Sequence, residues 1–405
     1  MSRVVFLHPD LGIGGAERAM IDAALALKSR GHSVKFVTAH HDPGHCFQET
    51  RDGTFSVTAV GDWLPRSMCG ICYAAWAYIR MIYAAIYLVF FSKMKYDVVI
   101  CDQISVCIPV LRIGNTRIIF YCHFPDQLLT QRKSFLKKLY RWPIDWMEEK
   151  TTGMADVVLV NSNFTAGLFK DTFTALDHIK PDVLYPIPDF QAFRKPIAPP
   201  TVDLMPKGTD KTIFLSINRY ERKKNLALAI RSLAKLGRLL GSMEGIHLVM
   251  AGGYDERVTE NIEYYQELVQ LATDLNVLEH ITFIRSFNDS QKRTLLAYSS
   301  CLLYTPDKEH FGIVPIEAMY MQCPVIAVKS GGPLETVSHK QTGFLCDPNP
   351  LSFAEAMKEI VKNPSFAKKL GEAGKNRVET MFSFNAFSEQ LNRVVSNLIE
   401  DKKEN

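Results

Sequence analysis

The sequence predicts an α/β protein in which two domains each contain a parallel sheet. A chain of 405 residues is longer than one ordinary hydrophobic core organises, so two domains are the default expectation. Short β-rich runs alternate with helical stretches from end to end, a pattern typical of parallel strands joined by crossover helices. A group of prolines divides the alternation into two series and indicates an interdomain connector: Pro186, Pro188, Pro196, Pro199, Pro200 and Pro206.

The β-rich runs of the first series predict strands at 3–7, 33–38, 96–101, 117–122 and 156–160. Those of the second series predict strands at 212–217, 246–250, 281–284, 301–304 and 324–328. We therefore expect two Rossmann-like domains, 1–190 and 211–384, that face each other across a cleft and carry their reactive groups on loops after the strands. We also expect a linker over 191–210 and a C-terminal helix and tail over 385–405. Packing of that helix on the N-terminal domain is one arrangement open to it.

Composition places the chain among folded globular proteins, with 47% hydrophobic and 22% charged residues. A net charge of +4 is too small to indicate a nucleic-acid partner. Nine cysteines occur without a secretory signal peptide before them, which favours a reducing, cytosol-facing location. Cys69 and Cys72 have the spacing of a redox motif, but no second pair would complete a zinc site, and we expect no metal ligands.

A glycine-rich loop, HPDLGIGGAER over 8–18, follows the first predicted strand. It precedes apolar residues with helical spacing: Met20, Ala23, Ala24 and Leu27. A strand, a glycine-rich turn and a helix N-terminus are the usual geometry for holding a phosphate on backbone N–H groups. The dinucleotide fingerprint would need a third glycine after Gly12 and Gly14, where Glu17 stands, and the Gly-Lys-Ser/Thr ending of a P-loop is absent. The loop therefore predicts phosphate contact of a kind that neither standard motif describes.

The segment 71–91 is almost continuously apolar and long enough, at about 31 Å as a helix, to span a bilayer. Arg80 near its centre would cost about 2.5–3.5 kcal/mol there. A span would also place strands of one parallel sheet on opposite sides of the membrane. We therefore expect a helix that packs partly on its own domain and partly enters one leaflet, with Ile86, Leu88 and Phe90 in contact with the membrane. A helix wholly buried in the domain is the alternative.

The segment 131–149 combines a basic face with apolar and aromatic residues. The basic residues are Arg132, Lys133, Lys137, Lys138 and Arg141, and the others are Phe135, Leu136, Leu139, Trp142 and Trp146. Such segments suit anionic lipid surfaces, although the solvated face of a crossover helix has a similar pattern. The tail Lys402-Lys403-Glu404-Asn405 has the form of a dilysine retrieval signal of the endoplasmic reticulum, and a frayed charged terminus is its alternative.

Two stretches of the second half carry the chemistry. In SINRYERKKNL, 216–226, the side chains of Arg219 and Lys224 stand where a strand gives way to a helix. Cations are unfavourable at a helix N-terminus unless they bind an anion, and this pair suits a diphosphate. In EHFGIVPIEA, 309–318, Glu309 and Glu317 are separated by seven residues. Glu317 can accept both hydroxyls of a ribose, and backbone N–H groups at the helix entrance can hold phosphate oxygens.

These motifs, in this order, resemble those of the retaining GT-B glycosyltransferases, whose second domain binds the nucleotide-sugar and whose first domain binds the acceptor. Stretches of the first half extend the resemblance: AHHDPGHCF (39–47), GDWLP (61–65), YCHFPD (121–126) and RWPIDWMEEKTTGMAD (141–156). They are similar to the GDP-mannose-dependent α-1,3/α-1,6-mannosyltransferases of dolichol-linked oligosaccharide assembly. The resemblance covers nearly the whole chain and is weakest over 188–210 and at the tail.

The resemblance implies an enzyme on the cytosolic face of the endoplasmic reticulum. It would add α-1,3- and α-1,6-linked mannose from GDP-mannose to mannosyl-chitobiosyl-diphosphodolichol. It would need no cofactor, and it would work in a complex with other early mannosyltransferases. Two other interpretations stay open on the residues alone: a UDP-dependent transferase or epimerase of the same fold, and a non-catalytic scaffold subunit.

The resemblance also implies a role for each motif residue. Arg219 and Lys224 would neutralise the leaving diphosphate, and Glu309 would either stabilise oxocarbenium-like charge or act as nucleophile. The remaining implied contacts are those of His123 with the donor sugar, Glu317 with the ribose, and the backbone of Gly14, Gly15, Gly312, Ile313 and Val314 with the donor.

Overall fold

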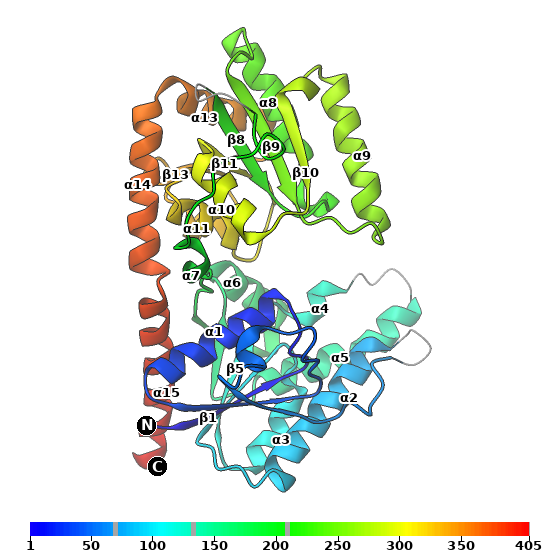
Figure 1. The fold of residues 1–405 in the computed structure, drawn as a ribbon. Coiled ribbons are helices and arrows are strands. Elements are labelled where there is room, and N and C mark those ends of the chain that lie inside the picture. The colour runs from blue at the N-terminus through cyan, green and yellow to red at the C-terminus, as the bar shows by residue number, and fades with distance from the viewer. Residues whose placement is uncertain (68–71, 131–134, 207–210, 405) are drawn as a thin grey trace. The chain divides into compact units, whose positions relative to one another are not determined.

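The computed structural model describes residues 1–67, 72–130, 135–206 and 211–404, with side chains as far as Glu400. The chain divides into two compact units, Met1–Ile187 with Phe384–Asn405, and Pro188–Ser383 (Figure 1). Several residues for which the sequence suggested roles lie outside the described side chains: Cys69, Arg132, Lys133 and the tail from Lys402 to Asn405.

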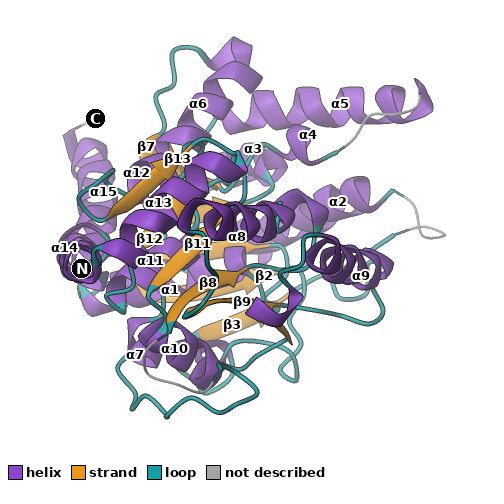
Figure 2. Cartoon of the chain, turned by 90° about the horizontal axis from the view of Figure 1, so that it is seen from above, coloured by secondary structure: helices purple, strands orange, loops and turns teal. Residues whose placement is uncertain are grey.

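The first unit contains a seven-stranded parallel sheet in the order β3-β2-β1-β4-β5-β6-β7. Figure 2 shows strands in orange, β2, β3 and β7 among them, with helices in purple around them. Its strands are β1 (Arg3–His8), β2 (Ser33–Thr38), β3 (Ser56–Ala59), β4 (Val98–Asp102), β5 (Arg117–Cys122), β6 (Val157–Val160) and β7 (Asp182–Val183). Its α-helices are α1 (Gly15–Ser29), α2 (Tyr73–Ile86), α3 (Ile108–Ile113), α4 (Asp126–Leu129), α5 (Phe135–Thr152), α6 (Asn163–Thr172) and α15 (Phe384–Glu404). Shorter turns are η1 (Gln48–Thr50), the π-helix η2 (Tyr87–Phe91), η3 (Ser105–Cys107) and η4 (Thr174–Leu176).

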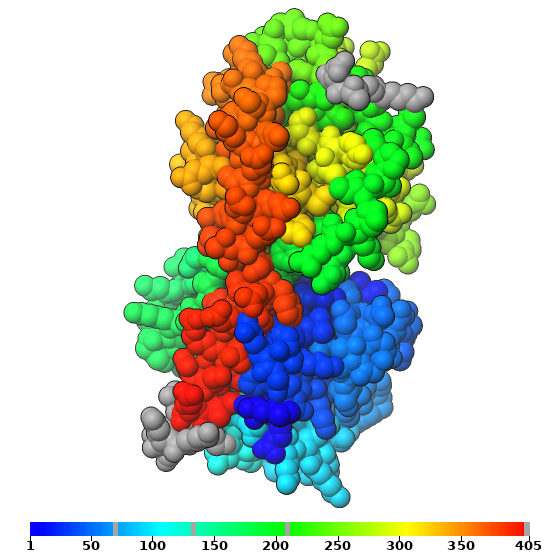
Figure 3. Space-filling view, turned by 60° about the vertical axis from the view of Figure 1, so that its left-hand side comes forward, coloured from blue at the N-terminus to red at the C-terminus, as the bar shows by residue number. Residues whose placement is uncertain are grey.

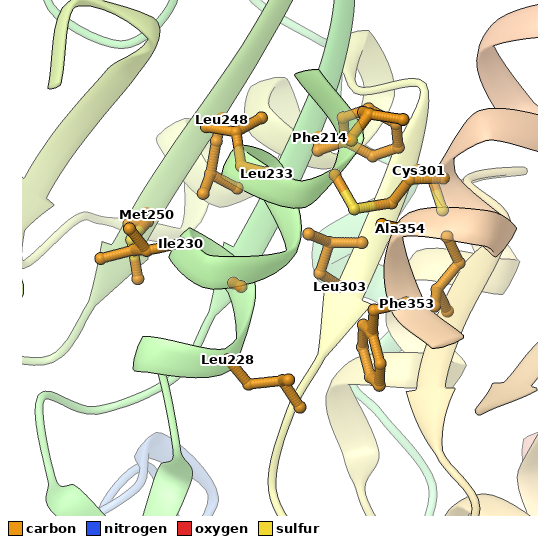
Figure 4. Packing of buried hydrophobic residues seen from close by; sticks show 14 of the residues in the cluster. Phe214, Leu228, Ile230, Leu233, Leu248, Met250, Cys301, Leu303, Phe353 and Ala354 are labelled. Carbon is orange, nitrogen blue, oxygen red and sulfur yellow. The ribbon is translucent and has the colours of Figure 1, made fainter. Parts of the chain in front are cut away.

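The second unit contains a six-stranded parallel sheet in the order β10-β9-β8-β11-β12-β13. Its strands are β8 (Thr212–Ile217), β9 (Ile246–Gly252), β10 (Ile281–Arg285), β11 (Cys301–Tyr304), β12 (Val325–Val328) and β13 (Gly343–Cys346). Its helices are α7 (Phe190–Phe193), η5 (Arg222–Lys224), α8 (Ala227–Leu240), α9 (Thr259–Asp274), η6 (Leu278–His280), α10 (Asp289–Tyr298), α11 (Ile313–Tyr320), α12 (Pro333–Thr336), α13 (Pro350–Lys362) and α14 (Pro364–Met381). Figure 4 shows side chains of α8 and α13 packing with those of β8, β9 and β11 in the core.

The predicted α/β architecture is confirmed, and all ten predicted strands are present within two residues of their expected ends. The sequence pattern did not predict β3, β7 and β13, which are edge strands of the two sheets. Edge strands are short and face solvent on one side, so they lack the continuous apolar run that identifies a central parallel strand. β7 has two residues and β13 begins with glycine.

The proline-rich segment forms part of the second unit, whereas the sequence suggested a linker over 191–210. The ring of Phe190 in α7 packs on the ring of Tyr320 with centroids 4.7 Å apart, and Leu204 and Met205 are buried. The C-terminal helix α15 packs on α1 within the first unit, where Figure 3 shows it beside the N-terminal part of the chain. Arg30, just after α1, donates hydrogen bonds to Asn385 and Ser388 of α15.

Helix α2 with η2 is the one helix of the described chain that is long and apolar enough to cross a membrane, and a third of that stretch is buried. The guanidinium of Arg80 is buried and donates to the carbonyl of Ala39 at 2.8 Å. The prediction for Leu88 is wrong, since its side chain is 1% exposed and packs in the core of the first unit. Helical spacing places it on the same face as the buried Met81. Ile86 is half-buried, and Phe90 is 57% exposed.

Helix α5 buries Ile144 but exposes five of its large apolar residues, and it buries one of its basic ones. Arg141, expected on the basic face, is 2% exposed and pairs with Asp126 at 2.8 Å and with Asp145. Lys137 and Lys138 are exposed. We call the following exposed residues of α4 and α5 the α5 surface: Leu128, Leu129, Phe135, Leu136, Leu139, Trp142 and Trp146.

Candidate active site

The four charged residues that the sequence singled out in the second unit lie at the carboxyl edge of its sheet. Arg219 and Lys224 follow β8, Glu309 follows β11, and Glu317 lies in α11, the next helix. Since β8 and β11 are neighbours in the sheet, the loops that leave them lie side by side. This edge is therefore where an anionic ligand would meet fixed positive charge.

Lys224 and Glu309 form a direct ion pair. The Lys224 ammonium donates to Glu309 Oε2 at 2.5 Å, and both side chains are largely shielded from solvent. Thr305 Oγ1 donates to the carbonyl of Lys224 at 2.8 Å, which ties the loop after β8 to the end of β11. The pair thus holds a carboxylate and an ammonium at one point of the sheet edge.

The contacts of Arg219 differ from those of the Lys224–Glu309 pair. Its side chain is 63% exposed, and its guanidinium lies 2.9 Å from Glu221. An exposed pair of this kind contributes little to stability, so the guanidinium can exchange Glu221 for a stronger anion. The structure therefore places Arg219 at the edge of the site as a cation that a ligand can recruit.

Glu317 is buried and pairs with Lys292 of α10, a residue that the sequence analysis missed. Lys292 Nζ lies 2.6 Å from both carboxylate oxygens. Burial raises the pKa of Glu317, while the charge and the hydrogen bond of Lys292 oppose that rise. The signal for Lys292 was present in the sequence, since a cation in the first turn of a helix is unfavourable without an anionic partner.

The entrance of α11 is shaped by backbone. Gly312, at φ 84°, precedes the helix, and no side chain caps the N–H groups that follow at Ile313 and Val314. The loop bearing Glu309 is braced by a second turn, in which the Gly332 N–H donates to the Glu309 carbonyl at 2.8 Å. Gly331 has φ 62°, and a Cβ there would lie 2.3 Å from that carbonyl oxygen, so the approach needs glycine.

In the first unit, His123 follows β5 and its Nε2 lies 2.9 Å from Asp102 Oδ2 at the end of β4. The other oxygen of this buried carboxylate lies 2.7 Å from Nδ1 of His8, the last residue of β1. The sequence analysis singled out His123 alone. Asp102 and His8 had no visible signal, because only the sheet order β1-β4-β5 brings the three strand ends together.

His123 lines a pocket of about 270 Å³ in the first unit, which also borders Ala77 of α2 and Asp126 of α4. Most of its lining is apolar, and a few polar groups converge on it, as in small-molecule sites.

Gly14 precedes helix α1, and Gly15 is the first residue of that helix. A Cβ at Gly15 would meet no described atom within 4 Å. No group of three His, Cys, Asp or Glu side chains that could hold a metal occurs within the described ranges.

Beneath this pocket, Glu148 of α5 accepts the backbone N–H groups of Asp126 and Gln127 at 2.6 and 3.1 Å. Burial raises the pKa of Glu148 to about 7, even though these hydrogen bonds favour the carboxylate. The folded state therefore binds more protons than the unfolded state between about pH 4.5 and pH 7. In this range the contribution of Glu148 makes the fold less stable as the pH rises.

Glu148→Gln should remove that dependence. The free energy of unfolding of the wild type, relative to that of the variant, should fall by about 3 kcal/mol from pH 4.5 to pH 8. Urea unfolding of both proteins at several pH values measures this difference. Parallel pH profiles would contradict the assignment.

Comparison with known proteins identifies the fold. A solved sucrose-phosphate synthase from Thermosynechococcus elongatus superimposes with a TM-score of 0.70 at 19% identity, covering 99% of this chain and 100% of that one. A glycosyltransferase from Rickettsia africae gives a TM-score of 0.73 at 18% identity, covering 98% and 99%. The predicted GT-B fold is confirmed.

Sequence comparison identifies the family. A model described as "Glycosyl transferases group 1" matches residues 205–377, and one described as "Glycosyltransferase Family 4" matches residues 13–188. The alpha-1,3/1,6-mannosyltransferase ALG2 of Homo sapiens is 56% identical over 98% of this chain and 96% of its own length. That of Saccharomyces cerevisiae is 40% identical over 99% of this chain and 86% of its own length. The chain belongs to the α-1,3/1,6-mannosyltransferase family of glycosyltransferases.

Proposed function

We propose that this enzyme transfers mannose from GDP-mannose to mannosyl-chitobiosyl-diphosphodolichol and forms both the α-1,3 and the α-1,6 linkage. In each transfer the anomeric carbon exchanges its bond to the GDP oxygen for a bond to an acceptor hydroxyl, whose proton is released. One observation carries the proposal: both carboxylates of the Glu309/Glu317 motif are held by lysines at the carboxyl edge of the sheet.

The second unit is proposed to bind the donor. Glu317 accepts the two ribose hydroxyls, and the charge and hydrogen bond of Lys292 favour the ionised form of its carboxylate. The N–H groups of Gly312, Ile313 and Val314 hold phosphate oxygens at the open end of α11. The donor diphosphate supplies the anion that draws Arg219 away from Glu221.

Turnover depends on charge that develops as the glycosidic bond breaks. Negative charge grows on the leaving diphosphate, where the ammonium of Lys224 and the guanidinium of Arg219 stabilise it. Positive charge grows on the sugar, and the carboxylate of Glu309, held by Lys224, faces it. Because these cations meet the donor charge, we propose that transfer needs no metal ion or other cofactor.

The first unit is proposed to serve the acceptor side and the sugar. His123, at the wall of the pocket, contacts the sugar of the donor, and the backbone of Gly14 and Gly15 contacts its phosphates. Open space at Gly15 leaves room for such an approach.

We further propose that the enzyme works on the cytosolic face of the endoplasmic reticulum, alongside other early mannosyltransferases. Its acceptor carries a polyprenyl chain, so the pocket must lie within reach of a membrane. Leu129 of the α5 surface lines this pocket, and the surface exposes two tryptophans and has Lys137 and Lys138 beside them. Aromatic side chains with flanking lysines suit a bilayer interface that contains anionic lipids.

Lys224→Ala should lower kcat about 10²- to 10³-fold while the protein stays folded, because the leaving diphosphate loses a cation. Lys223→Ala is the matched control, since Lys223 is exposed and pairs with Glu221. The assay uses GDP-mannose and lipid-linked mannosyl-chitobiose, with linkage analysis of the products and with UDP-mannose as the competing donor. Unchanged turnover of a folded Lys224→Ala protein would sink the assigned role.

Gly15→Val should abolish transfer with little loss of thermal stability, since the new side chain occupies the space proposed for the donor phosphates. Gly167→Val in α6 is the control. A Cβ there also points into open space, and valine has a higher helix propensity than glycine, so the control should not destabilise α6 on that account. Melting curves of both variants measure the loss of stability, and turnover assays measure the loss of transfer. Equal losses of stability and activity in Gly15→Val would refute the contact.

Serine at Phe135, Trp142 and Trp146 together should weaken partition into vesicles that contain anionic lipid at least about tenfold, since each buried aromatic contributes about 1.5–3 kcal/mol. The control triple replaces three exposed apolar residues of the second unit: Val258, Leu278 and Leu351. Phe90→Ser tests the remaining exposed member of the group first expected to touch lipid. Flotation of all variants on liposomes provides the measurement. Equal partition of the two triple variants would contradict the α5 surface as the contact.

A further inference from the structure

We propose that Glu17, His8 and Asp102 form a buried chain that fixes the orientation and tautomer of His123, and that they are positioning residues for mannosyl transfer. The inference rests on the proposed contact of His123 with the donor sugar. The three residues belong to the first unit and Lys224 to the second, and their effect on the reaction would pass through His123.

The chain crosses three neighbouring elements of the first unit. The Glu17 carboxylate of α1 lies 3.6 Å from Nε2 of His8, and Nδ1 of His8 lies 2.7 Å from Asp102 Oδ1. Asp102 Oδ2 lies 2.9 Å from Nε2 of His123. His8 and Asp102 are completely buried, whereas 19% of each side chain is exposed at the two ends, Glu17 and His123. The chain thus runs from the glycine-rich loop to the pocket wall.

Charge within the chain dictates which ring nitrogen of His123 carries a proton. Burial alone would lower the pKa of His8, but the carboxylates of Asp102 and Glu17 raise it to about 10, so His8 is a cation at neutral pH. Burial also opposes ionisation of Asp102, yet contact with the two histidines lowers its pKa, so it remains a carboxylate. A carboxylate only accepts, so Nε2 of His123 must donate. Nδ1 of a neutral His123 is then left with its lone pair for another donor, such as a sugar hydroxyl.

The glycine-rich loop has a sequence that suits this chain. A Cβ at Gly14 would lie 2.2 Å from the Glu17 carboxylate, so a glycine there lets Glu17 fold back toward His8. Glu17 occupies the position of the third glycine in a dinucleotide fingerprint. Glu17, the residue that departs from the fingerprint, therefore supplies the carboxylate at which the chain begins.

A purely structural role makes a different prediction from a positioning role. If Asp102 acts through His123, its loss should matter only while His123 is present. If Asp102 merely supports the fold, its loss should have the same effect with and without His123.

The test is a double-mutant cycle with Asp102→Asn, His123→Ala and the double variant. Asp102→Asn should lower kcat about 10- to 100-fold with small changes in KM, as loss of a residue that orients a functional histidine does. The double variant should be no slower than His123→Ala. Because Asp102→Asn risks misfolding, Glu17→Gln provides a second cycle with a smaller expected loss of kcat. In both cycles, ¹⁵N NMR of histidine reports the tautomer of His123.

His32→Gln is the control. It alters another buried histidine, which contacts Asn392 beside the amino end of β2, and it should leave kcat unchanged.

Four outcomes are informative. If the losses of kcat in the single variants multiply in both double variants, this inference alone is overturned. The same holds if kcat is unchanged in Asp102→Asn and Glu17→Gln while His123→Ala is slow. Unchanged turnover in His123→Ala would overturn it together with the proposed role of His123. Loss of the Asp102 effect in the His123→Ala background would support it.

Discussion

A carboxylate that folding removes from water must receive a cation or hydrogen-bond donors, and this constraint shapes the functional edge of both sheets. Glu317 is buried against Lys292, Glu309 is held by Lys224, and Asp102 lies between two histidines. Each partner comes from a different strand end, loop or helix, so these contacts also fix the geometry of the segments that carry them. Parallel strands place all of these loops at one edge of each sheet.

The same pairs set the site up for chemistry. Lys224 is held by Glu309, and its ammonium can still donate further hydrogen bonds to a phosphate. The exposed guanidinium of Arg219 has only a weak partner to give up. A donor that brings its own negative charge would thus enter a site whose cations are already in place, which is what stabilisation of a leaving group requires.

The two apolar helices of the first unit show how position decides what an apolar side chain does. The segment of α2 and η2 looks the more membrane-like in sequence, yet Leu88 packs in the core and Arg80 hydrogen-bonds to a buried carbonyl. Helix α5 is more polar overall, yet it exposes Trp142 and Trp146. The hydrophobicity of a segment indicates how much apolar surface its helix has. Packing of that helix against the sheet decides which part of this surface remains exposed to solvent.

The sequence by itself determined the two-unit α/β fold, the positions of its central strands along the chain, and the four charged residues Arg219, Lys224, Glu309 and Glu317 as the motif proposed to bind the donor. These features depend on short-range periodicity and on residue spacing, which a linear sequence records directly. Only the tertiary structure decided the partners of those residues. Lys292 reaches Glu317 across 25 positions, and His8 reaches Asp102 across 94, because sheet order and helix packing bring distant segments together. The tertiary structure also decided that Leu88 and Arg141 are buried, since burial depends on the elements that pack around a helix.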